Sequence, residues 1–160
     1  MSPQMPRDRG SVGPGRRRWL AALLVAYCGL ILYATLRPFR FGWPADLFAG
    51  SRRYEWIPFT YPCPRHGVLC PWDKSVNLLA FVPLGVLLAL LSGGTSGRTP
   101  AARLWRATAW GAALSLGIEI TQVFLPTRYP SSVDLLMNAL GTCLGAFLAI
   151  RPWRGSRGDP

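Results

Sequence analysis

The feature that most constrains this chain is a set of four long apolar blocks separated by arginine-rich segments. The blocks cover about residues 19–36, 75–91, 107–125 and 133–150. A membrane-spanning helix needs about 17–25 mostly apolar residues, and an isolated strand cannot satisfy its backbone polar groups in lipid. The sequence therefore predicts an all-α membrane protein with four transmembrane helices. The first block is longer than the apolar core of a signal peptide, so we expect it to remain as an uncleaved span.

Composition excludes two broad classes of protein. The chain is 50% hydrophobic and only 16% charged, which is too apolar for a disordered chain and too poorly charged for an ordinary soluble domain. The net charge of +11 could suggest a nucleic-acid partner. However, the arginines lie between the apolar blocks instead of on one basic face, as in membrane topology signals. The lipid bilayer is therefore the expected partner, and nucleic acid is not.

The basic residues also predict the orientation. Eleven of the 18 lie at the start of the chain, between the second and third blocks, or after the fourth: Arg7, Arg9, Arg16, Arg17, Arg18, Arg98, Arg103, Arg106, Arg151, Arg154 and Arg157. Because cytoplasmic loops are enriched in lysine and arginine, we expect both termini in the cytoplasm of a multi-pass cell-membrane protein. Residues 1–18 form a basic disordered N-terminus in this interpretation, residues 19–150 the transmembrane domain and residues 151–160 a basic tail.

The segment between the first two blocks, residues 37–74, is the longest extracytoplasmic piece of this topology. It contains six prolines, which prevent a long regular helix. Cys63 and Cys70 lie in it, and a disulfide between them is one interpretation, because this compartment permits oxidation. Together with His66 they offer three metal ligands, but no fourth ligand is evident. We therefore predict neither a metal nor a cofactor.

Polar side chains within the apolar blocks, and at their outer ends, are the candidate site residues, because hydrocarbon makes each of them costly. Spacings of three and four residues place Ser115, Glu119 and Gln122 on one face of the third helix. Asp134 and Asn138 share a face of the fourth helix. The predicted topology brings these groups to the extracytoplasmic half of the bilayer. The complete candidate ligand-binding set is Asn77, Ser115, Glu119, Gln122, Arg128, Asp134 and Asn138.

Two interpretations of this set are open. Polar residues on packed faces often join helices, and an ion pair between Glu119 and Arg128 would secure the last two spans as a hairpin. Alternatively, an intramembrane acid beside amides and a rim arginine indicates a functional site.

Two further basic residues, Arg37 and Lys74, lie at the same rim. Gly141 and Gly145 are four residues apart, which predicts close packing of the fourth helix against a neighbour.

Several motifs in this chain resemble those of the VanZ-like family. They are Thr35-Leu-Arg-Pro38, Trp56-Ile-Pro58-Phe59, the run from Asp73 to Gly85, the run from Ser115 to Gln122, Arg128, and Asp134-x3-Asn138-x2-Gly141. The resemblance covers about residues 20–150 and implies a small multi-span protein of the bacterial envelope. The family is named for a protein that confers teicoplanin resistance without altering the peptidoglycan stem terminus. Many members carry acidic residues where this chain has Ser131, Ser132 and Val133, which argues against a metal role for this run.

The resemblance and the polar set together suggest a protein that binds or shields an envelope ligand at the outer leaflet. The expected ligand is a glycopeptide antibiotic or a lipid-linked wall precursor, with its apolar anchor against the third and fourth spans. Arg128 is the natural partner for a phosphate or carboxylate in its head. One alternative is an enzyme that acts on a lipid, with Glu119 as general base and Asp134 as its partner. Another is a purely structural membrane subunit; the sequence leaves the oligomeric state open.

Overall fold

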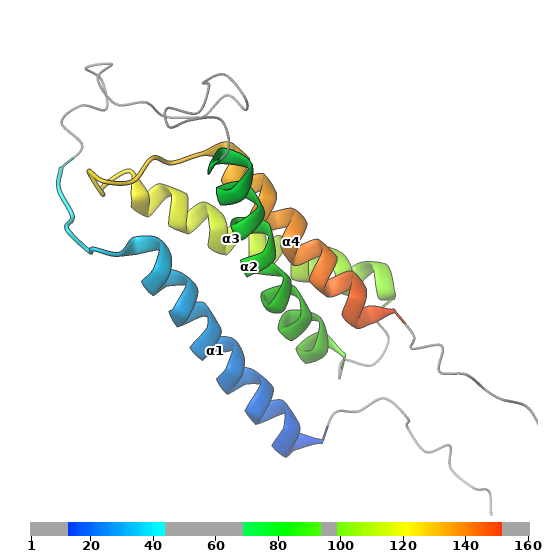
Figure 1. Cartoon of the computed structure of the whole chain (residues 1–160). Coiled ribbons are helices and arrows are strands. Elements are labelled where there is room, and N and C mark those ends of the chain that lie inside the picture. The colour runs from blue at the N-terminus through cyan, green and yellow to red at the C-terminus, as the bar shows by residue number, and fades with distance from the viewer. Residues whose placement is uncertain (1–12, 44–68, 94–98, 152–160) are drawn as a thin grey trace, which may run out of the picture.

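Four α-helices make up the bundle (Figure 1). The computed structural model describes residues 13–43, 69–93 and 99–151. The helices are α1 (Pro14–Leu36), α2 (Leu69–Ser92), α3 (Pro100–Gln122) and α4 (Ser132–Ile150). Neighbours in sequence run in alternating directions, so the starts of α1 and α3 lie at the same end of the bundle as the ends of α2 and α4. The predicted all-α fold with four helices is confirmed.

The first two helices begin earlier than the apolar blocks that predicted them. Residues 14–18, which the sequence analysis assigned to a disordered N-terminus, form the first turns of α1. Proline at the first helical position sets a helical φ and loses no hydrogen bond, and the three arginines that follow are good helix formers. In the same way, α2 begins at Leu69, six residues before its apolar block. Both α1 and α2 therefore begin before the apolar block from which each was predicted.

The third helix differs most from its prediction, which was residues 107–125. It begins at Pro100 because the Oγ1 of Thr99 accepts a hydrogen bond from the Ala102 N–H at 3.2 Å, and it ends at Gln122 in a turn. Within the described ranges, hydropathy and length qualify three helical segments as membrane spans: α1, Lys74–Ser92 and α4. The third predicted span thus stays a prediction. Four large apolar side chains of α3 are nevertheless exposed, Trp105, Trp110, Leu116 and Ile120, beside the exposed Arg106 near its start.

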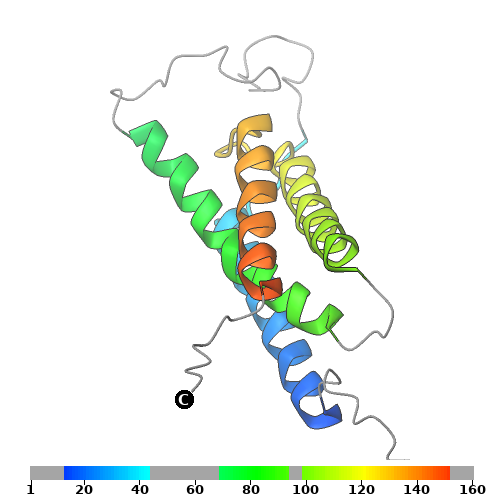
Figure 2. The same cartoon turned by 90° about the vertical axis from the view of Figure 1, so that its right-hand side faces the viewer.

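Glycine packing brings α2 and α4 into close contact along their length. A Cβ atom added to Gly141 would overlap the carbonyl oxygen of Leu78, and one added to Gly145 would overlap that of Val82. On the opposite helix, a Cβ at Gly85 would overlap the carbonyl of Thr142. The close approach predicted from Gly141 and Gly145 is therefore confirmed, and its partner is α2. In Figure 2, α4 lies across α2 with α3 beside it.

The first helix lies on the outside of the bundle (Figures 1 and 2). Ile31 is its buried residue, and it joins a small core with side chains from α2 and α3. The Tyr27 hydroxyl donates a 2.7 Å hydrogen bond to the carbonyl of Ala80. Beyond α1, the Gly42 N–H donates to the carbonyl of Phe124 at 2.9 Å. This bond fixes the chain after α1 against the turn that joins α3 to α4.

Candidate functional site

A polar network joins three helices at the end of the bundle where α4 begins. The Lys74 Nζ lies 2.7 Å from the Asp134 Oδ1 and 3.1 Å from the Ser131 Oγ. The Ser131 N–H donates a 2.8 Å hydrogen bond to the Oε2 of Glu119, whose exposed fraction is 3%. Both acids lie beside the N-terminus of α4, where the helix dipole favours negative charge. The network thus connects α2, α3 and α4.

A second polar layer lies about one turn further along α4. The Asn138 Nδ2 donates to the Ser115 Oγ at 2.8 Å, and both residues are buried. The Thr142 Oγ1 donates to the carbonyl of Asn138 at 2.9 Å. The Oδ1 of Asn138 is buried and has no hydrogen-bond partner among the described residues. The predicted faces of α3 and α4 do meet, and the bond between Asn138 and Ser115 joins them.

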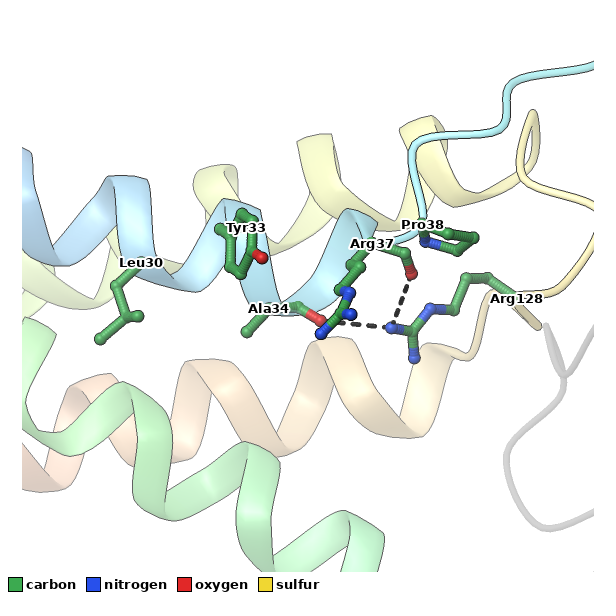
Figure 3. A pocket seen from close by; sticks show the side chains of 6 residues that line it. All are labelled: Leu30, Tyr33, Ala34, Arg37, Pro38 and Arg128. Atoms are coloured by element: carbon green, nitrogen blue, oxygen red, sulfur yellow. Dashed lines mark hydrogen bonds between the residues drawn. The ribbon is translucent and has the colours of Figure 1, made fainter.

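The ion pair expected between Glu119 and Arg128 is not formed. Instead, the Arg128 Nη2 donates to the carbonyls of Ala34 at 3.2 Å and Arg37 at 3.0 Å (Figure 3). The Gln122 Nε2 donates to the nearby carbonyl of Thr35 at 3.3 Å. The last carbonyls of a helix have no donor within the helix, so the end of α1 attracts these side chains. Glu119 already has the Ser131 N–H as its partner.

An open groove of about 640 Å³ lies at this end of α1 (Figure 3). Its lining is Leu30, Tyr33, Ala34, Arg37, Pro38 and Arg128. The groove thus combines a largely apolar wall with two guanidinium groups. Across the three described ranges, neither arginine forms a salt bridge with a carboxylate. We expected a ligand anchor against the third and fourth spans, whereas this groove lies on α1; we call it the α1 groove.

A second groove, of about 390 Å³, lies between α1 and α2. Leu23, Tyr27, Val82, Pro83, Val86 and Leu87 line it. Its wall is apolar, since the Tyr27 hydroxyl is bonded to the backbone of α2. Both grooves therefore have α1 as one wall.

The remaining candidates have fewer contacts or lie outside the described residues. Asn77 is half-buried, and its side chain forms no hydrogen bond with another described residue. Cys63, His66 and the side chain of Cys70 lie outside the described part of the chain, so the disulfide stays a prediction. Within the described ranges, no group of three or more His, Cys, Asp or Glu residues could hold a metal ion.

Sequence reasoning missed two parts of this arrangement. Ser131 links the acids to Lys74, and its position just before α4 is one that serine commonly occupies as a helix cap. Arg37 lines the α1 groove, whereas its position directly after an apolar block predicts only a residue at the rim. No sequence pattern predicts that the backbone carbonyls of Ala34 and Arg37 accept hydrogen bonds from the Arg128 side chain.

Apolar side chains cover the outside of this bundle, while Ser115, Glu119 and Asn138 are buried inside it. This inverted distribution and the three apolar helices define a helical membrane protein. The chain belongs to the VanZ/LLP1 family, whose model matches residues 24–153. The resemblance to VanZ-like proteins is thereby confirmed. No curated protein and no solved structure matches the chain.

Proposed function

We propose that this protein binds an amphipathic ligand of the bacterial envelope at the outer leaflet and shields it. The ligand is a glycopeptide antibiotic with a fatty tail or a lipid-linked wall precursor. The observation that carries this proposal is the α1 groove, where an apolar wall meets Arg37 and Arg128. The excess of arginine at the opposite end of the helices supports an extracytoplasmic position for the groove.

The contacts support different roles for the two sets of polar residues. Glu119 and Asn138 are buried and bonded to Ser131 and Ser115, so we assign them to holding the helices together. Arg37 and Arg128 line an open groove, so we assign them to the ligand. A general base must reach its substrate, and an exposed fraction of 3% argues against that role for Glu119. Binding is therefore better supported than catalysis.

Teicoplanin susceptibility tests the glycopeptide branch of the proposal. A sensitive Gram-positive host would express wild type, Arg128→Gln or the control Arg106→Gln, with the amount of each protein in the membrane measured. Arg106 is an exposed residue near the other end of α3. We expect wild type and Arg106→Gln to raise resistance, and Arg128→Gln at equal abundance to lose it.

Two results would contradict this assignment. No change of susceptibility with wild type would exclude the glycopeptide as the ligand and leave the lipid-linked precursor. A second variant, Glu119→Gln, tests the polar network directly. If it abolished resistance at normal abundance while Arg128→Gln did not, the ligand site would lie in the polar network and not in the groove.

A further inference from the structure

We propose that the ligand of the α1 groove is a lipid that carries a phosphate head on one long apolar chain. This inference rests on the proposed function and names the class of ligand that the site takes. The head binds between Arg37 and Arg128. The apolar chain of the lipid lies along α1, away from these arginines and toward the second groove beside Tyr27 and Pro83.

The charges of the α1 groove favour phosphate over a carboxylate. Arg37 and Arg128 extend into the same groove in Figure 3, and no carboxylate of the described ranges pairs with either. Two cations beside apolar surface repel each other, and a head with two negative charges removes this repulsion. A phosphate monoester or diphosphate has that charge and matches the planar fork of guanidinium donors. A carboxylate has a single charge and would leave one arginine unpaired.

The bonds of Arg128 hold one of these cations in place. Its Nη2 is fixed by the carbonyls of Ala34 and Arg37, and its other nitrogens form no hydrogen bond within the described residues. The guanidinium is therefore oriented before a ligand arrives, with donors to spare. A preorganised donor loses less conformational freedom on binding than a mobile side chain does.

The length of the apolar path favours a long chain. Leu23, Tyr27, Leu30 and Ala34 recur at offsets of four, three and four, so the walls of both grooves share one face of α1. From Leu23 to Arg37 this face is about 21 Å long, at 1.5 Å per residue. One leaflet of the hydrocarbon core is about 15 Å deep. A chain that fills both grooves is therefore longer than one leaflet, as in a polyprenyl phosphate.

The binding of lipid probes to the full-length protein in phosphatidylcholine nanodiscs tests whether the phosphate head is recognised. The probes are a long-chain polyprenyl phosphate, the matching polyprenol and inorganic phosphate. We expect the polyprenyl phosphate to bind about tenfold or more tightly than either of the others, and Arg37→Gln and Arg128→Gln each to weaken it by about tenfold. Arg106→Gln is the control and should bind as wild type does. We expect Arg37→Gln to preserve the fold, because the Arg37 side chain forms no hydrogen bond within the described residues and its backbone carbonyl is retained.

A tryptophan substitution in the second groove tests the path of the lipid's apolar chain. Leu23→Trp narrows the second groove, so it should weaken the long-chain phosphate by about tenfold and leave farnesyl phosphate, which is too short to reach it, unchanged. Leu116→Trp on the exposed face of α3 is the matched control. Equal weakening of both chain lengths by Leu23→Trp, or none, would overturn the path along α1.

The outcomes separate this inference from the proposed function. Equal affinity for polyprenol and polyprenyl phosphate would show that the head is not recognised, and tight binding of inorganic phosphate would show an anion site without a lipid. Either result overturns the inference. Teicoplanin is tested in the same nanodiscs. If it binds and polyprenyl phosphate does not, this inference is wrong and the proposed function stands; if neither binds, this inference and the glycopeptide branch of the proposed function are both wrong.

Discussion

At the scale of single residues, Glu119 shows how a carboxylate is retained inside an apolar bundle. Its Oε2 accepts the Ser131 N–H, and the N-terminus of α4 lies beside it. Glu119→Ala would leave that N–H buried without an acceptor, so we expect a loss of about 1–3 kcal/mol in the free energy of unfolding. Glu119→Gln retains an acceptor oxygen and should lose less.

Unfolding in mixed micelles of dodecyl maltoside and SDS measures the free energy of unfolding of both Glu119 variants. Comparison with wild type distinguishes a helix-joining role of Glu119 from a catalytic one. Should Glu119→Ala be as stable as wild type, the bond to Ser131 would contribute nothing to the fold, and Glu119 would again be a candidate for chemistry.

Lys74 and Asp134 form a pair in which each side chain is about three-quarters buried, with exposed fractions of 25% and 22%. Such a pair is less screened than one in water, so we expect the two residues to be coupled by about 0.5–3 kcal/mol. A double-mutant cycle of Lys74→Met and Asp134→Asn, read out as unfolding in the same micelles, measures that coupling. Strictly additive effects would show that the 2.7 Å contact does not stabilise the bundle.

At the scale of helices, the glycines of α4 determine how closely it packs. Gly145→Ala would drive a methyl group into the Val82 carbonyl, and overpacking of this kind costs about 1–3 kcal/mol or more. Gly117 on α3 is the matched control, since a Cβ there meets nothing within 4 Å. Gly117→Ala should raise the unfolding free energy by up to about 1 kcal/mol. Equal effects of the two substitutions would contradict the close α2–α4 contact.

The sequence predicted the helices well because membrane helices are defined by length and hydropathy. It also placed Ser115 and Asn138 on packed faces, since helical periodicity determines which residues share a face. The ion pair between Glu119 and Arg128, one of the two interpretations, is not formed, because both side chains bond to backbone atoms that no side-chain pattern encodes. The groove on α1 was missed for the same reason, as it depends on how α1 packs against the turn after α3.

At the scale of the whole molecule, the arginine-rich segments and the α1 groove lie at opposite ends of the helices. Six of the nine arginines in the described ranges lie at one end, whereas the α1 groove and the polar network lie at the other. A cationic groove at the cytoplasmic end would be one of many basic sites there. At an extracytoplasmic end, Arg37 and Arg128 would instead be two of a smaller number of cations. Orientation in the membrane therefore decides which leaflet supplies the ligand.

Cysteine labelling in intact cells tests this orientation. In a background without the four native cysteines, Tyr129→Cys lies in the exposed turn between α3 and α4, and Gly13→Cys precedes α1. Because arginine-rich segments are retained in the cytoplasm, we expect a membrane-impermeant maleimide to label Tyr129→Cys in intact cells and Gly13→Cys only after permeabilisation. The reverse pattern would put the groove at the inner leaflet and contradict the proposed function. Labelling of both from the same side would show that one of α1, α2 and α3 does not cross the membrane, and α3 is the one whose hydropathy does not qualify it as a span.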